Sequence, residues 1–170
     1  MPVDGVAELR TTSSKSTADA QEYFVRAIAH DAQRERLVCA CECCIGGVTA
    51  EQAKWKDKSG NHSIEELANH LIFWDDRALQ KFKGGQSPQF SGNNEETFNS
   101  FDSESWNATV QKLDKVLTDW EKAVEDADES KLKDWYSTIA HIGTHNAYHT
   151  GQIIYIRRLQ GSWDPAKGVK

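Results

Sequence analysis

The stretch SIEELANHLIFWDDRALQKFKGG, residues 63–85, decides the fold of this chain. Ser63 followed three residues later by Glu66 is a capping box, which predicts that a helix begins here. Gly84 and Gly85 predict where that helix ends. Its apolar residues recur at helical spacing along one side: Ile64, Leu67, Leu71, Trp74, Ala78 and Phe82. The stretch therefore predicts an amphipathic helix with one buried face.

Three further stretches have the same helical periodicity. One begins near Thr17 and stops at Gly46, one begins near Ser103, and the last spans Ser137–Gln160. No alternating strand pattern competes with them. Four helices of this length predict an all-α fold, a four-helix bundle.

The connections between these helices differ in length. We interpret residues 49–61 as a polar connection and the charged run 125–134 as a solvated one. Residues 84–102 are rich in turn formers, and so long a loop indicates a crossover or a functional loop. Residues 1–16 are polar and aperiodic, so we expect a flexible tail followed by a single domain over 17–170.

Composition excludes several classes of protein. The 170 residues contain 20 basic and 26 acidic side chains, and this formal charge of −6 argues against nucleic-acid binding. The chain has no apolar run long enough to cross a membrane, and its first twenty residues have no apolar core of a secretory signal. We expect a soluble, acidic, cytoplasmic protein.

All four cysteines lie close together, at Cys39, Cys41, Cys43 and Cys44. One tight cluster cannot staple distant parts of a fold. A thiolate metal site or redox switch is one interpretation. Small buried side chains at a helix interface are the other, and we prefer it because CACECC matches no zinc-knuckle spacing.

Three histidines follow one another at intervals of four residues: His141, His145 and His149. Each such step moves about 40° around a helix and about 6 Å along it. Two neighbours in this row can bind one metal ion, but three spread over about 12 Å cannot all do so comfortably. A third ligand must then come from another helix. The flanking Ile142 and Ile153 direct His145 and His149 towards the bundle interior.

His70 is the candidate for this third ligand. It belongs to the second helix, where it lies at the edge of the apolar stripe beside Trp74. Together with the last helix it completes a set of three histidines from two facing helices, as metal sites in bundles do. The alternative for each is a hydrogen-bonded core histidine without metal. His30 and His62 have no partner at ligand spacing, so we interpret both as structural and expect His62 to be exposed.

Two segments, NHLIFWDDRAL and HIGTHNAYHTGQIIYIRRLQGSW, resemble the DinB/YfiT-like superfamily of metal-dependent enzymes. The similarity extends over nearly the whole chain from about residue 18. Its most specific element is the pattern H-x-x-x-H-x-G-Q, from His145 to Gln152, with His70 upstream between Asn69 and Leu71. Thr150 stands where the family often has arginine.

This resemblance implies an up-down-down-up bundle, in which the long connection over 84–102 crosses between parallel neighbouring helices. It implies that His70, His145 and His149 bind a divalent ion, often zinc or nickel, and that His141 is a supporting or core residue. Members often form homodimers. Those with assigned activities include transferases and isomerases that use a low-molecular-weight thiol, such as bacillithiol, mycothiol or glutathione.

Several neighbouring side chains have two interpretations. Glu66 is either a fourth ligand one turn before His70 or part of the capping box, which we prefer. Asp75 and Asp76 either orient an imidazole or lie on a solvated helix face, which we also prefer. Trp74, Tyr148 and Gln152 are candidates to line a pocket, with ordinary helix packing as the alternative.

Three neutral nitrogen ligands leave a bound ion its full charge and an open position, which suits activation of a thiol or of water. The main hypothesis is transfer of a low-molecular-weight thiol to a small electrophile. Metal-dependent hydrolysis, a non-enzymatic metal-binding stress-response bundle and a metal-free core are the alternatives. No general base or other catalytic residue is assigned from the sequence.

Overall fold

The computed structural model describes residues 43–58, 62–99 and 105–167. Over this part of the chain the regular elements are all helical: α3 (Ala50–Lys54), α4 (Ile64–Phe82), η1 (Asn94–Asn99), α5 (Trp106–Glu125), α6 (Glu129–Leu159) and η2 (Pro165–Lys167). The predicted all-α class is confirmed. The tail and most of the first predicted helix lie outside the described residues, but residues 43–45 are helical and end at the predicted Gly46-Gly47 pair.

The second predicted helix is α4, with the expected start and end. The Ser63 hydroxyl accepts a hydrogen bond from the Glu66 amide at 3.2 Å, and the Glu66 carboxylate accepts one from the Ser63 amide at 2.7 Å. At the other end Gly84 has a φ of 80°, a left-handed conformation that favours glycine. The Gly85 amide then donates to the Gln80 carbonyl at 2.8 Å, which completes a Schellman C-cap.

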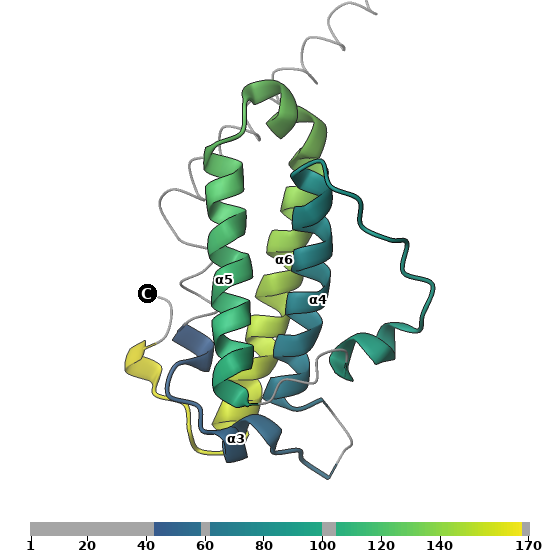
Figure 1. Cartoon of the computed structure of the whole chain (residues 1–170). Helices are drawn as coiled ribbons and strands as arrows, with labels where there is room; N and C mark the ends of the chain where they lie inside the picture. The colour runs from purple at the N-terminus through teal and green to yellow at the C-terminus, as the bar shows by residue number, and fades with distance from the viewer. Residues whose placement is uncertain (1–42, 59–61, 100–104, 168–170) are drawn as a thin grey trace, which may run out of the picture.

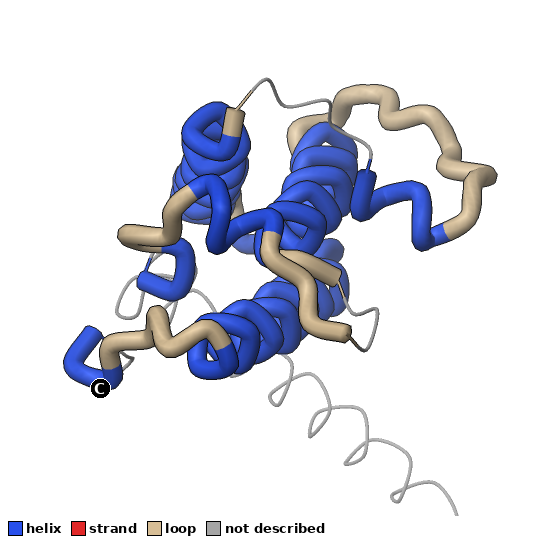
Figure 2. The backbone as a smooth tube through the Cα atoms, turned by 90° about the horizontal axis from the view of Figure 1, so that it is seen from below, coloured by secondary structure: helices blue, strands red, loops and turns tan. Residues whose placement is uncertain are grey.

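The three long helices lie side by side, with α4 and α5 pointing the same way and α6 pointing the opposite way (Figure 1). Only residues 126–128 join α5 to α6, so these two helices run antiparallel, and α4 packs against both of them. The connection from α4 to α5 instead returns along the length of the bundle. Figure 2 shows that it stands out beside α4, on the side away from α5. The described part of this connection, residues 84–99, is therefore the predicted crossover.

The core lies between these helices, and α4 contacts both α5 and α6. Its largest fully buried apolar side chains come mainly from α4, with one each from α5 and α6: Phe82, Ile64, Leu67, Leu71, Leu79, Leu113 and Ile153. Apolar burial of this kind is the main source of stability in such a bundle. The predicted stripe of α4 thus faces the bundle interior.

Two of the predicted connections contain helical residues. The last helix begins at Glu129, eight residues before the predicted Ser137, because Asp128 caps it through the Lys131 amide at 2.8 Å. Glutamate and lysine favour helix, so a charged run was a poor sign of a loop here. The short helix α3 lies inside the predicted polar connection 49–61, and its capping box is formed by Thr49 and Gln52.

Polar side chains join the helices at one end of the bundle and in its interior. The Trp120 indole donates to the Asp75 carbonyl at 2.9 Å, and the Trp106 indole donates to the Val48 carbonyl at 2.8 Å. Arg157, which is 5% exposed, donates from Nη1 to the Cys44 carbonyl at 2.7 Å. The two indole bonds join α5 to α4 and to the segment before α3, and the Arg157 bond holds α6 against residues 43–45.

Candidate metal centre

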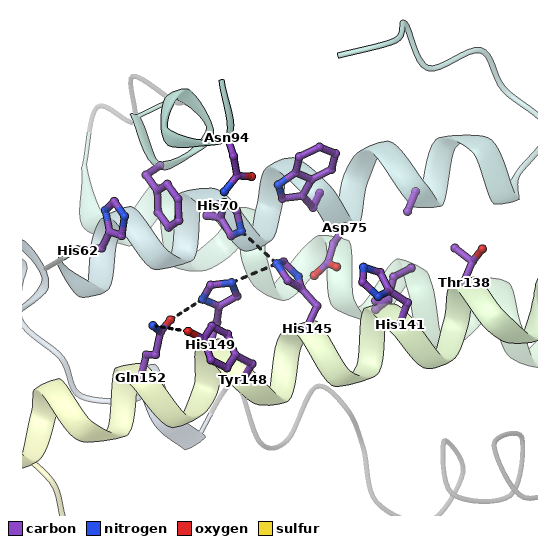
Figure 3. Close-up of a pocket in the computed structure, with 14 residues that line it drawn as sticks. His62, His70, Asp75, Asn94, Thr138, His141, His145, Tyr148, His149 and Gln152 are labelled. Atoms are coloured by element: carbon purple, nitrogen blue, oxygen red, sulfur yellow. Dashed lines mark hydrogen bonds between the residues drawn. The ribbon is translucent and has the colours of Figure 1, made fainter. Parts of the chain in front are cut away.

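Three histidine side chains from two helices meet at one point between α4 and α6 (Figure 3). The Nε2 atom of His145 lies 3.0 Å from Nε2 of His70 and 3.1 Å from Nε2 of His149. His70 and His149 are buried, and His145 is half-buried. The sequence predicted this set, because His145 and His149 lie one turn apart on α6 and His70 lies on the facing helix.

The ring of His70 is held by the crossover. Its Nδ1 atom lies 2.5 Å from Oγ1 of Thr97, and that hydroxyl donates its own hydrogen to the Asn94 carbonyl at 2.6 Å. The hydroxyl oxygen is therefore left to accept, which assigns the proton of His70 to Nδ1. Phe98 stacks on the same ring, with centroids 4.1 Å apart. The lone pair on Nε2 is consequently directed at His145.

The ring of His149 is held within α6. Its Nδ1 atom lies 2.7 Å from Oε1 of Gln152, and Nε2 of the same amide donates to the Tyr148 hydroxyl at 3.3 Å. A carbonyl oxygen can only accept, so the proton of His149 is also assigned to Nδ1. The two rings thus have the same tautomer for the same reason. Outer hydrogen bonds of this kind orient histidines that ligate metals.

These tautomers leave more hydrogen-bond acceptors than donors where the three rings meet. Two Nε2 lone pairs face the Nε2 atom of His145, which can donate a proton to only one of them at a time. Burial first, and then His149 and His145, lowers the pKa of His70 to about 3. Burial, followed by His149 and His141, lowers the pKa of His145 to about 4. Burial also lowers the pKa of His149, so all three rings are neutral at pH 7.

A divalent cation satisfies all three nitrogens at once. Zinc binds imidazole nitrogen at about 2.0–2.1 Å, so two ligands of a tetrahedral ion lie about 3.3 Å apart. The separations of 3.0 and 3.1 Å are close to that value. The neutral rings, their fixed tautomers and their spacing therefore fit a divalent ion.

The three histidines form part of the wall of a pocket of about 620 Å³ between α4, η1 and α6. Aromatic and apolar side chains share this wall with polar ones. The other lining residues are His62, Trp74, Asp75, Ala78, Asn94, Phe98, Thr138, His141, Ile142, Tyr148 and Gln152. A small molecule in this pocket would lie against the Nε2 atoms.

A family model of the DinB superfamily matches residues 29–153, which is more than half of the chain. The chain belongs to the DinB superfamily. This confirms the resemblance found in the two histidine-bearing segments. A search of curated proteins and a search of solved structures find no match. Among the described helices of this DinB superfamily member, none has the length and apolar composition of a membrane span.

Glu66 has the capping function and is not part of the histidine cluster. Its carboxylate accepts from the Ser63 amide at 2.7 Å and from Nζ of Lys56 at 2.6 Å. Lys56 contributes to lowering its pKa, although burial opposes this effect. The interpretation that we preferred from the sequence therefore describes this residue.

The remaining candidates lie around the pocket of this DinB superfamily protein. Trp74 meets the His70 ring edge-on, with centroids 6.5 Å apart. His141 is exposed and its ring lies parallel to that of His145 at 6.4 Å, outside the group of three. Tyr148 is exposed at the pocket wall, next to the His149 ring. Of the four cysteines, Cys43 and Cys44 lie among the described residues, and Cys44 is fully buried.

Asp75 does not lie on a solvated face, which corrects the interpretation that we preferred. It is 0% exposed, its Oδ2 accepts from Nδ2 of Asn146 at 3.1 Å, and its Oδ1 has no hydrogen-bond partner. Burial raises its pKa to about 7, although the Asn146 bond opposes this. Its neighbour Asp76 is exposed and accepts from Gln80, as a solvated residue does.

Four residues of this site were missed or undervalued from the sequence: His62, Asn94, Thr97 and Phe98. The last three come from η1 in the crossover, and only the length of that loop indicated a role for it. His62 stacks on Phe98 with centroids 3.6 Å apart and lines the pocket, so it is not the exposed, purely structural residue that we expected. The DinB superfamily site therefore depends on a segment without any motif.

Replacing Asp75 by asparagine keeps the shape of this side chain and removes its ionisation. Because its folded-state pKa of about 7 lies above the ordinary 3.8, the folded protein binds this proton more tightly than the unfolded chain does. Its contribution to stability is therefore lost progressively as the pH rises from about 3.8 to about 7. We expect Asp75→Asn to raise Tm by roughly 3–6 °C at pH 8 and by a clearly smaller amount at pH 5, where only part of that contribution has been lost.

Thermal unfolding of chelator-treated protein, followed by circular dichroism at both pH values, measures this difference. The exposed neighbour provides the control, since Asp76→Asn should give no pH-dependent gain. An Asp75→Asn protein that is no more stable than wild type at pH 8 would contradict the burial argument.

Proposed function

We propose that this protein is a divalent-metal-dependent enzyme that transfers a low-molecular-weight thiol to a small electrophile. The observation that carries the proposal is the convergence of three neutral Nε2 atoms in a pocket wall, where Nε2 of His145 lies 3.0 Å from that of His70 and 3.1 Å from that of His149. His70, His145 and His149 would hold the ion. Imidazole suits several divalent metals, among which we propose zinc or nickel.

The donor set supports an open site and not a closed structural one. Three neutral ligands leave the ion its positive charge and at least one free position, whereas structural zinc sites have four protein ligands. Among the described residues the group of three includes no carboxylate or thiolate, and Glu66 is engaged by Ser63 and Lys56. A bound divalent ion would supply charge that lowers the pKa of a thiol or a water beside it.

The residues around the site orient the proposed ligands and exclude water from the pocket. Thr97 and Gln152 hold two of the rings so that their lone pairs face one point. Trp74, Phe98 and Ile142 cover the pocket with apolar surface, which strengthens electrostatic interactions inside it. In the proposed transfer, the thiol sulfur forms the new bond to an electrophilic carbon. The leaving group departs with the bonding electron pair, and the thiol proton passes to solvent.

The first prediction concerns metal content. Untagged wild-type protein should contain about one divalent ion per chain, and His149→Ala or His70→Ala should contain little, since two ligands hold an ion far more weakly than three. Elemental analysis by mass spectrometry measures this. His141→Ala is the matched control, because it removes a histidine one turn before His145 and should keep the metal. Equal, low metal in wild type and His149→Ala would refute the proposed site.

The second prediction concerns the hydrogen bond that orients His70. Thr97→Val replaces a fully buried hydroxyl by a methyl group of similar size, so the fold should be retained. We expect the affinity for zinc to fall about 10–100-fold, because the partner of His70 Nδ1 is lost. Competition with a chromogenic chelator measures it. Thr138→Val, also in the pocket wall, is the control and should leave zinc affinity unchanged.

The third prediction concerns the reaction. Zinc- or nickel-loaded protein should accelerate addition of bacillithiol, mycothiol or glutathione to a fluorogenic alkyl chloride, and His70→Ala should abolish the acceleration. Turnover of an ester without any thiol would favour a metal-dependent hydrolase. An ion that raises Tm while the protein is inert with every thiol and electrophile would favour a non-enzymatic metal-binding bundle.

A further inference from the structure

A second cavity, of about 440 Å³, lies between the segment after α3 and the last turns of α6. Its wall contains four large apolar side chains with substantial exposure: Trp55 at 38%, Tyr148 at 63%, Tyr155 at 61% and Leu159 at 49%. Among the described residues, these are the exposed large hydrophobic side chains, and all four gather here. We call this cavity the aromatic groove. A large exposed apolar patch of this kind is typical of a binding site.

The aromatic groove adjoins the histidine pocket. His62, Tyr148 and Gln152 line both cavities. Gln152 connects them chemically, because its amide accepts from His149 at 2.7 Å and donates to the Tyr148 hydroxyl at 3.3 Å. A molecule that reaches the three Nε2 atoms can therefore extend past Tyr148 into the groove. The shared wall thus places an apolar cavity directly beside the three histidines.

The charges of the residues that line the two cavities restrict which chemical groups a bound molecule can have. Among the described residues that line either cavity there is no lysine or arginine. The charged side chain in the groove is Asp57, a carboxylate. A negatively charged group placed there would lose water without gaining a cationic partner, which is unfavourable. An uncharged ring would instead bury apolar surface against the faces of Trp55 and Tyr155.

We infer that the aromatic groove binds an uncharged aromatic group of the small molecule that reacts at His70, His145 and His149. This inference rests on the proposed function, since it names the substrate class of the same site. It assigns Trp55, Tyr155 and Leu159 to recognition of the substrate. It assigns the histidines and their partners to the chemistry.

The groove is tested first without any metal. N-phenyl-1-naphthylamine is an uncharged probe whose fluorescence rises in apolar surroundings, and 8-anilino-1-naphthalenesulfonate has the same rings with one sulfonate. We expect chelator-treated full-length protein to bind the uncharged probe about tenfold more tightly than the anionic one. Tyr155→Ser and Leu159→Ser should each weaken the uncharged probe about tenfold, as loss of one buried apolar side chain does.

Tyr136→Ser is the matched control, because Tyr136 lies on the same helix outside both cavities and its loss should not change probe binding. Equal affinity for the two probes, or affinity that Tyr155→Ser and Leu159→Ser leave unchanged, would overturn the inference. Sedimentation of each variant provides a further test. Dissociation of a dimer by Tyr155→Ser would show that the groove is a contact between copies of this chain, which would also overturn the inference.

The link to the three histidines is tested with cobalt(II)-loaded protein, whose charge-transfer absorption reports a bound thiol. Benzyl mercaptan should saturate this signal at a concentration about tenfold lower than mercaptoacetate, and Tyr155→Ser should remove that preference. Equal saturation by the two thiols in wild type would overturn the inference while leaving the metal site intact. Failure to load cobalt would refute the proposed function, whereas probe binding to metal-free protein would still test the groove.

Discussion

The parallel arrangement of α4 and α5 is the constraint on which the rest of this structure depends. Helix α4 has 19 residues and is therefore about 28 Å long, so the chain must return that distance before α5 begins. The return segment passes beside α4 and contributes η1. That short helix supplies Thr97 and Phe98, which hold His70 by a hydrogen bond and a ring stack. The topology of the bundle thus supplies the partners of one proposed ligand.

The interior of the bundle combines ordinary apolar packing with a set of polar groups that do not satisfy one another. Among the buried side-chain atoms without a hydrogen-bond partner are Oδ1 of Asp75 and Oδ1 of Asn146, and the Nε2 lone pairs of the histidines add to them. Buried polar groups of this kind reduce stability. They lie within the same part of α4 and α6, which is where the pocket is. The buried leucines and isoleucines along both helices offset their cost.

Much of the fold was predictable because its signals are local. The capping box and the apolar stripe of α4 are patterns within one short stretch of sequence. Helix geometry alone places His145 and His149, four residues apart, on the same face. The start of α6 was not predictable from charge, since glutamate and lysine suit both helix and solvent. The role of Thr97 was not predictable from the sequence, because it comes from a contact with His70 on another element. The burial of Asp75 was likewise decided by Asn146 and Trp120, on other helices.

His70 and His145 are separated by 75 residues of sequence, yet their Nε2 atoms are neighbours. Whatever holds both nitrogens closes a long loop of the chain, and it does so only while α4 and α6 remain packed together. Such a reversible cross-link, unlike a disulfide, would be lost on unfolding, so it would stabilise the folded state by mass action, and it could be exchanged without chemical reduction. Binding of the proposed metal ion would therefore be coupled to the integrity of the bundle, so that metal availability would also change the stability of the folded protein.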